Sequence, residues 1–138
     1  MLALQGDIDM PMEYNYDADA NIIRTHPYAE VSLSEVIAYI DDLIHNSAIA
    51  DRSIEVVHLD KVDNFIFSSE EAHGLPAKLY ELFNEKNIQA TVLVGKRDLH
   101  YGTARMLKTI YELQDPNYPS FVVRNDEELH RVIRDILG

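Results

Sequence analysis

Hydrophobic residues recur along this chain with two different periods, which predicts strands that alternate with helices. Short segments with alternating or continuous apolar residues are typical of strands, and apolar residues spaced three and four apart are typical of helices. Strands are expected at about residues 12–16, 22–26, 54–59, 90–94 and 121–124. Helices are expected at about 33–47, 69–86 and 101–114, with a last helix after Asn125. The resulting order, ββαβαβαβα, predicts an α/β domain with a mixed sheet of about five strands and four helices.

Three of the expected helices begin with a residue pattern suited to an N-terminal cap. Ser32, Ser68 and Asn125 each precede a glutamate by three residues, so that the two side chains can satisfy free backbone N–H groups of the first turn. Gly74 and Pro76 interrupt the first turns of the second helix. The segment before that helix, residues 61–67, is expected to be a loop.

The length of 138 residues fits one domain, which we place at residues 12–138, after a disordered leader at 1–11. The leader lacks the basic and apolar regions of a secretory signal, and no run approaches the roughly 18 apolar residues of a membrane span. The chain has no cysteine, which excludes disulfides and thiolate metal sites and fits a reducing cytosol. We therefore expect a cytoplasmic protein.

The formal net charge of −12 and a pI near 4.7 argue against general binding to nucleic acid or anionic membranes. Against this background, four of the twelve Lys and Arg residues fall between positions 96 and 108. They follow the most apolar strand and overlap the start of a helix, where free N–H groups attract anions in α/β sheets. The sequence thus predicts a site for an anionic ligand or a protein partner at Lys96, Arg97, His100, Tyr101, Gly102 and Arg105.

Each part of this predicted site has a structural alternative. Arg105 can grip a carboxylate or phosphate, or it can pair with an acidic residue of its own chain, as can Lys108 with Glu112. Gly102 can let a ligand approach the backbone, or it can permit close helix packing.

The apolar segment Phe65, Ile66 and Phe67 also has two interpretations of equal weight. It can pack in the core, or it can form a contact surface such as a homodimer interface.

Two segments of the chain resemble a known family. Residues 59–69 (LDKVDNFIFSS) are similar to a strand–loop–helix junction, and residues 98–106 (DLHYGTARM) with 121–128 (FVVRNDEE) are similar to the C-terminal part of STAS-like domains. The resemblance is to the SpoIIAA-like branch, related to anti-sigma-factor antagonists, and covers about residues 12–137. It implies a STAS-like α/β fold and a regulatory role through protein contacts.

In the regulatory members of that family a serine at this junction accepts a phosphate, and the resemblance places Ser69, or its neighbour Ser68, in that position. Here Phe67 stands in place of the family's aspartate and Glu70 in place of its glycine. A negative side chain beside the hydroxyl repels an incoming phosphoryl group. A role as helix cap already accounts for Ser68, and its replacement by alanine would cost about 1 kcal/mol of stability.

No catalytic pattern occurs in the sequence. The six histidines are scattered, none shows the spacing of a zinc-binding helix, and no nucleophile adjoins His100. We expect no metal and no cofactor. The sequence favours a non-enzymatic STAS-like binding or regulatory module acting through a protein partner, a homodimer or a small anionic or lipid-like ligand. The alternative is a small ligand carrier or enzyme with an anion site at 96–108.

Overall fold

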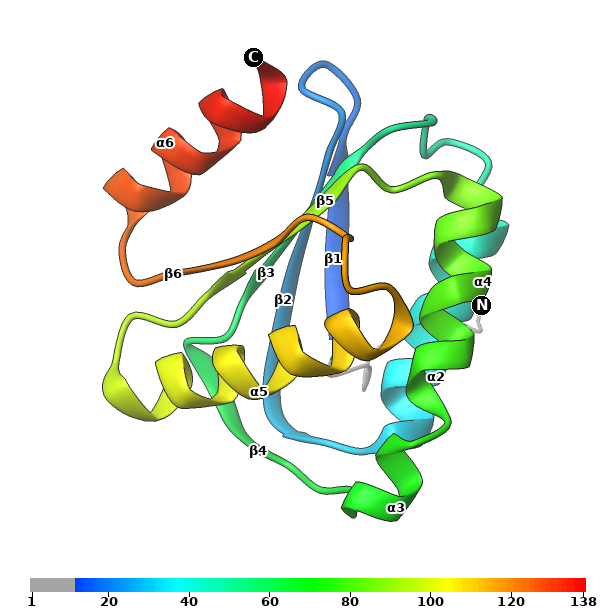
Figure 1. The fold of residues 1–138 in the computed structure, drawn as a ribbon, viewed down its shortest axis with the longest axis vertical. Helices are drawn as coiled ribbons and strands as arrows, with labels where there is room; N and C mark the ends of the chain where they lie inside the picture. The colour runs from blue at the N-terminus through cyan, green and yellow to red at the C-terminus, as the bar shows by residue number, and fades with distance from the viewer. Residues whose placement is uncertain (1–11) are drawn as a thin grey trace, which may run out of the picture.

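The computed structural model describes residues 12–138, in which one mixed sheet carries helices on both faces (Figure 1). The strands are β1 (Met12–Asp17), β2 (Ile22–Val31), β3 (Ile54–His58), β4 (Lys61–Phe65), β5 (Ala90–Val94) and β6 (Ser120–Val123). The helices are α2 (Leu33–His45), α3 (Ser69–Ala72), α4 (Leu75–Lys86), α5 (Asp98–Gln114) and α6 (Asp126–Leu137). The expected leader at 1–11 lies outside the described residues.

The sheet has the strand order β1-β2-β3-β5-β6, and β4 pairs with β2 beyond the end of β3. β1 and β2 form an antiparallel hairpin, whereas β3, β5 and β6 continue the sheet in parallel. The predicted α/β class and mixed sheet are confirmed. The expected count of about five strands is corrected to six in the described chain, because residues 61–65 form β4 and not a loop.

The additional strand forms because β2 is ten residues long. Its first half pairs with β3 and its second half, from Tyr28 onward, pairs with β4, with a register shift between Ala29 and Glu30. Ala29 has φ 59°, and this left-handed residue stands at the register shift within the pairing of β2 with β4. β4 is thereby held parallel to β2 and delivers Phe65 to the edge of the core.

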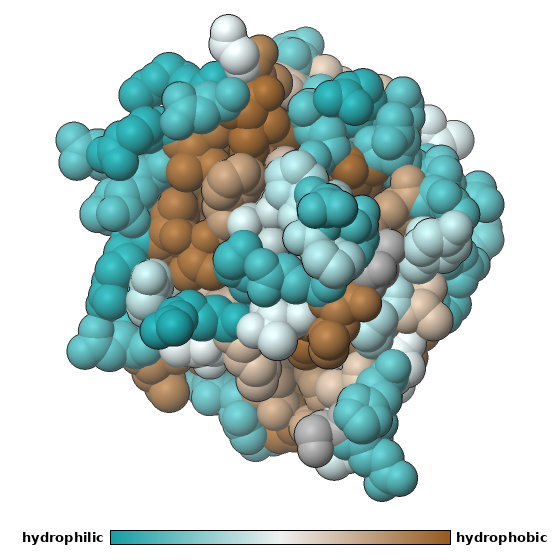
Figure 2. Space-filling view, viewed as in Figure 1, coloured by the Kyte–Doolittle hydropathy of each residue, from teal (hydrophilic) through white to brown (hydrophobic). Residues whose placement is uncertain are grey.

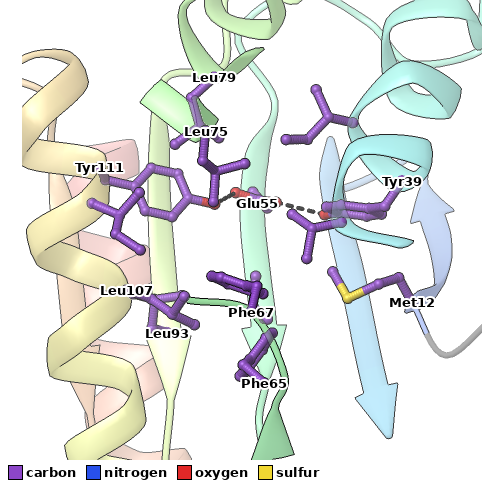
Figure 3. A pocket seen from close by; sticks show the side chains of 14 residues that line it. Met12, Tyr39, Glu55, Phe65, Phe67, Leu75, Leu79, Leu93, Leu107 and Tyr111 are labelled. Carbon is purple, nitrogen blue, oxygen red and sulfur yellow. Dashed lines mark hydrogen bonds between the residues drawn. The ribbon is translucent and has the colours of Figure 1, made fainter. Parts of the chain in front are cut away.

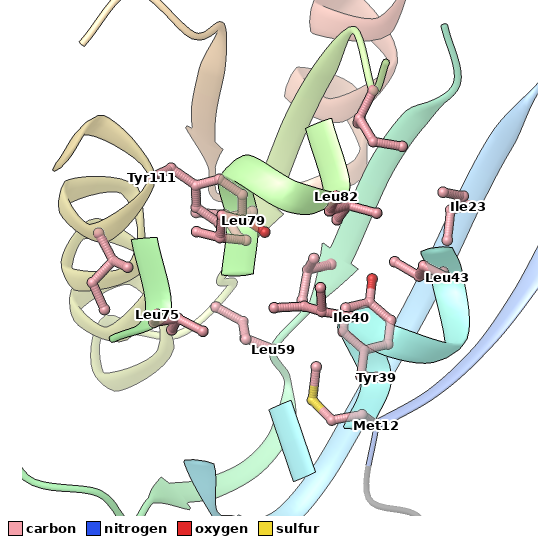
Figure 4. Close-up of a cluster of buried hydrophobic side chains, with 14 of the residues drawn as sticks. Met12, Ile23, Tyr39, Ile40, Leu43, Leu59, Leu75, Leu79, Leu82 and Tyr111 are labelled. Atoms are coloured by element: carbon pink, nitrogen blue, oxygen red, sulfur yellow. The ribbon is translucent and has the colours of Figure 1, made fainter. Parts of the chain in front are cut away.

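Each face of the sheet has its own apolar core. Residues of α6 cover one face, where Leu129 and Ile133 pack on Ile54, Val56 and Val92. The opposite face is covered by α2, α4 and α5, and its larger core includes Ile40, Leu43, Leu59, Leu79 and Leu82 (Figure 4). The central strands β3 and β5 are therefore buried on both sides, which explains their continuous apolar pattern.

The capping patterns operate as predicted. Ser32 and Ser68 accept hydrogen bonds from the backbone N–H groups of Glu35 and Glu71, and Asn125 accepts one from that of Glu128. The expected helix at 69–86 is two helices, because α3 ends before Gly74 and Pro76 supplies the first turn of α4. Helix α5 starts at Asp98, three residues earlier than expected.

Candidate functional site

The start of α5 lies directly against the end of β5 because the first residue after β5 is Gly95. A Cβ atom on Gly95 would stand 2.5 Å from the carbonyl carbon and oxygen of His100 and 2.7 Å from the backbone nitrogen of Tyr101. Real Cβ atoms do not approach backbone this closely, so only glycine permits the contact. Gly102 is exposed and a Cβ there would meet nothing within 4 Å. Of the two alternatives for Gly102, close helix packing is therefore wrong, and Gly95 has that role.

His100 points inward from the first turn of α5. Its ring is 4% exposed, and its Nε2–H donates to the backbone carbonyl of Val62, at 2.9 Å. This bond ties α5 to β4. Nδ1 of the same ring has no hydrogen-bond partner in residues 12–138.

The predicted cationic side chains do not converge on one point. Nζ of Lys96 lies 3.3 Å from Oδ1 of Asp126, and Lys108 pairs with Glu112. Tyr101 lies under the guanidinium of Arg124, whose Cζ is 4.3 Å from the ring centroid, and Arg124 also pairs with Asp98. Within the described chain, Arg97 and Arg105 are exposed and make no ion pair. A common anion site at 96–105 stays a prediction. The alternative of internal pairing holds for Lys108, which pairs with Glu112, but Arg105 has no such pair among the described residues.

Ser68 functions as a helix cap in this structure. Its Oγ accepts the N–H of Glu71 at 3.0 Å, and Oε1 of Glu71 accepts the N–H of Ser68 at 2.9 Å. The side chain of Ser69 lies outside the described part of the structure. Phosphorylation at either serine stays a prediction.

The segment Phe65–Phe67 divides between the core and the surface. Phe65 and Phe67 are half-buried and meet edge to face with their centroids 6.0 Å apart, whereas Ile66 is 47% exposed. The two rings form the floor of a groove of about 410 Å³ between α3 and α5. Its other apolar walls are Ala72, Met106, Ile110 and Leu113.

Helix α5 presents a row of exposed apolar side chains beside this groove. Leu99, Met106 and Leu113 are seven residues apart and are 69%, 47% and 66% exposed. Residues spaced by seven lie along one side of a helix. Figure 2 shows hydrophobic side chains reaching the surface among hydrophilic ones on the face that α5 crosses. We call Leu99, Met106 and Leu113 the α5 apolar surface.

A second polar centre, which the sequence did not reveal, lies in the core. Glu55 in the middle of β3 is 1% exposed. Its Oε1 accepts hydrogen bonds from Tyr111, at 2.7 Å, and Thr91, at 2.8 Å, and its Oε2 accepts one from Tyr39, at 2.5 Å (Figure 3). Two further hydroxyls extend the network, Thr25 beside Tyr39 and Tyr118 beside Thr91. Three O–H donors on two oxygens fit an ionised carboxylate.

This network shifts the titration of its tyrosines. Burial, and then the negative charge of Glu55, raise the pKa of Tyr39, Tyr111 and Tyr118 well above the ordinary value of 10.0. Nearer the surface, burial and the carboxylate of Asp42 raise the pKa of Tyr14 to about 12. The folded protein thus holds these phenol protons more tightly than the unfolded chain does.

This difference predicts alkaline unfolding. Because the folded pKa values are raised, their contribution to stability is intact below pH 10.0 and is lost as the pH rises above that value. We expect tyrosinate absorbance from the three buried rings to appear together with the loss of circular dichroism. Full titration of all eight tyrosines in a protein that keeps its native circular dichroism would contradict the buried network.

Other candidate centres are absent from the described residues. No three His, Asp or Glu side chains of residues 12–138 lie close enough together to hold a metal ion. None of the helices in this part of the chain has the length and apolar character needed to cross a bilayer.

The arrangement of strands and helices matches known structures. No protein-family model matches the sequence, and no curated protein matches it significantly. The fold is similar to that of the anti-sigma factor antagonist SpoIIAA in its unphosphorylated form, with a TM-score of 0.52 and 11% identity over 89% of this chain and 97% of that one. It is equally similar, with a TM-score of 0.52 and 8% identity over 88% of this chain and 91% of the other, to an uncharacterized protein from Shewanella loihica of the DUF3478 family with a SpoIIAA-like fold. The chain therefore has a SpoIIAA-like fold, as its motifs predicted.

Proposed function

We propose that this chain is a regulatory protein-interaction module, and that a protein partner binds the α5 apolar surface. The single observation that carries the proposal is the exposure of Leu99, Met106 and Leu113 along one side of α5. Isolated exposed apolar residues are common, but a row of them beside an apolar groove marks a contact surface. The likeness to an antagonist of an anti-sigma factor supports a regulatory role.

The chemistry around this surface indicates the kind of partner. A helix that carries apolar side chains every three or four residues can lay them against Met106 and Leu113 and into the groove. Arg105, exposed beside Met106 and free of ion pairs among the described residues, can then meet an acidic side chain at the rim. Phe65 and Phe67 add aromatic side chains to the lining of the groove.

The test is a charge placed on the surface. We expect Leu113→Glu to weaken partner capture by roughly tenfold or more, because a carboxylate would be buried without a counter-charge. Leu137→Glu is the matched control, since Leu137 is 61% exposed on α6 and lies outside the groove. The wild type and both variants are affinity-purified from the native host, and mass spectrometry measures how much partner protein co-purifies with each.

Light scattering distinguishes a second copy of this chain from a different partner. A dimer in solution that Leu113→Glu dissociates and Leu137→Glu does not would identify the occupant as a second copy. Equal capture of the same proteins by the wild type and Leu113→Glu would overturn the proposal.

A further inference from the structure

Three basic side chains gather on the face of the sheet that carries α6, opposite to α2, α4 and α5 (Figure 1). Successive side chains of a strand point to opposite faces, so Arg24 and His26 share the α6 face with Ile22 of β2. His58 shares this face with Val56 of β3, and α6 packs on both apolar residues. We call Arg24, His26 and His58 the sheet-face basic cluster. His26 is exposed, and the other two side chains are half-buried.

The three side chains of the cluster lie close together. The rings of His26 and His58 stack, with their centroids 4.8 Å apart and their planes 5° apart. This contact follows from the parallel register of β2 and β3, which brings the two residues side by side. Arg24 stands two residues before His26 on the same face, about 7 Å along the strand. A single ligand group can therefore reach all three side chains.

The donors of the cluster are not used inside the described chain. The histidine rings that make hydrogen bonds among residues 12–138 are those of His45 and His100, and the arginine side chains that do so are those of Arg52 and Arg124. None of the ion pairs in this part of the chain includes the cluster. Acidic residues outnumber Lys and Arg by 24 to 12, so the unpaired state of Arg24 does not result from a shortage of acids.

The nearest acidic side chains do not engage the cluster. Glu13 lies opposite His26 in the ladder of β1 and β2, but the two form no ion pair. Oδ1 of Asp60 accepts the backbone N–H of Lys96, at 3.2 Å, and Nζ of Lys96 pairs with Asp126. The cluster thus lacks a counter-charge of its own among the described residues.

The titration of His58 reflects this lack of negative charge. Burial, and then the positive charges of His26 and Arg24, lower the pKa of His58 below its ordinary value of 6.5, and the carboxylate of Asp60 offsets this only in part. An anion bound against the cluster would raise the pKa of His58 again, because a nearby negative charge favours the protonated ring. Anion binding and protonation of the cluster are therefore expected to support each other.

The arrangement of the donors selects a tetrahedral oxyanion. A metal ion lies close to the plane of each imidazole that binds it, along the lone pair of a ring nitrogen, and two stacked parallel rings cannot both meet this condition for one ion. The guanidinium of Arg24 carries a fork of N–H groups that matches phosphate oxygens, and each imidazole adds an N–H donor. Three side chains suit the three free oxygens of a phosphate better than the two of a carboxylate. We propose that the sheet-face basic cluster binds a phosphate group, either as free phosphate or as part of a small phosphate monoester.

The experiment is a titration of the whole chain with inorganic phosphate at about pH 6, followed through the imidazole NMR signals of His26 and His58. We expect saturable shifts of both rings with a dissociation constant of roughly millimolar size, and no such shifts from chloride at the same ionic strength. A parallel titration with glycerol 3-phosphate distinguishes the two sources of the phosphate group. Tighter binding than that of inorganic phosphate would identify a monoester as the ligand, and weaker binding would identify free phosphate; both results support the site.

Sulfate separates the charge of the cluster from that of the ligand, because it stays a dianion while histidine loses its proton between about pH 6 and pH 8. We expect the affinity for sulfate to fall about tenfold over this range. The titratable and charged groups that face the two rings come from β1, β2, β4 and the loops after β3 and β5: Glu13, Arg24, Tyr28, Asp60, Lys61 and Lys96. No charge of α6 acts on the pKa of His58. An ordinary carboxylate, lysine, arginine or tyrosine keeps its charge state over this range, so the change is assigned to the histidines.

One variant and a matched control locate the site. Arg24→Gln should weaken phosphate binding about tenfold, because it removes the guanidinium fork. Arg131→Gln makes the same change at an exposed arginine of α6 that, like Arg24, has no ion pair in the described chain, and it should leave binding intact. Three results would each contradict the proposal: no saturable shift of the two rings, an affinity for sulfate that does not depend on pH, or equal binding by Arg24→Gln and the wild type. Leu113→Glu lies on the other side of the sheet and should not alter phosphate binding, so failure here leaves the proposed partner surface untouched.

Discussion

Glu55→Ala is expected to lower the free energy of unfolding by about 3–5 kcal/mol, because it removes the acceptor of three buried hydroxyls and leaves a cavity. Tyr39, Thr91 and Tyr111 all direct their protons at this carboxylate, and two of these side chains come from different helices. The carboxylate therefore joins α2, β5 and α5 to the centre of the sheet. Urea denaturation followed by circular dichroism measures the change.

Two matched variants control this result. Glu112→Ala removes a partly exposed glutamate whose pair with Lys108 joins neighbouring turns of α5, and such pairs contribute about 0.3–0.5 kcal/mol. Glu55→Gln keeps one acceptor oxygen and should be less destabilising than Glu55→Ala. If Glu55→Ala and Glu112→Ala had the same effect, the hydroxyls would not depend on Glu55 in the folded protein.

Gly95→Ala is expected to destabilise the fold by about 3 kcal/mol, at the upper end of overpacking effects. The added Cβ would meet backbone atoms of His100 and Tyr101 at 2.5–2.7 Å. Backbone in the first turn of a helix cannot rotate away as a flexible side chain can, so α5 must shift from the end of β5. This shift would also strain the bond between His100 and Val62. Thermal unfolding of the variant beside the wild type measures the effect.

Gly102→Ala makes the same chemical change seven residues further along and should have the opposite sign. Gly102 is exposed within α5, and an added methyl group would touch nothing within 4 Å. Alanine in a helix interior is favoured over glycine by about 0.5–1 kcal/mol. Destabilisation of equal size at both positions would show that α5 does not approach Gly95 as the structure has it.

The sequence was sufficient for the fold where local signals agreed with tertiary packing. Ser32, Ser68 and Asn125 marked helix starts because capping is a local interaction between residues three apart. The apolar run 90–94 indicated a central strand because burial on both faces removes all alternation. The motifs of the SpoIIAA-like family then supplied the topology, which the structural comparison confirms.

The missed elements depend on contacts distant in sequence. β4 carries Lys61, Asp63 and Asn64, which are typical of a loop, and becomes a strand because the far half of β2 offers it a pairing edge. The break at Gly74 was visible, but it did not decide between an irregular helix and two helices. Such outcomes are set by tertiary pairing, which overrides local propensity.

The site was harder to predict for the same reason. From the sequence, Glu55 in the apolar strand 54–58 could face either the solvent or the core. Its three hydroxyl partners lie 16, 36 and 56 residues away along the chain. The basic cluster at 96–108 was visible as charge, but Asp126, which pairs with Lys96, and Arg124, which pairs with Asp98, follow β6 much later in the sequence. The exposed row on α5 was hidden because Leu99, Met106 and Leu113 look like core residues in a sequence.

Photo-crosslinking tests the partner surface most directly. A photoreactive phenylalanine analogue placed at position 113, and separately at position 137, samples two exposed leucine positions on different helices of the same protein. Irradiation in the native host should give a discrete protein adduct, or a crosslinked dimer, from position 113 and none from position 137. The absence of any adduct at position 113, or the same adducts from both positions, would contradict a partner bound along α5.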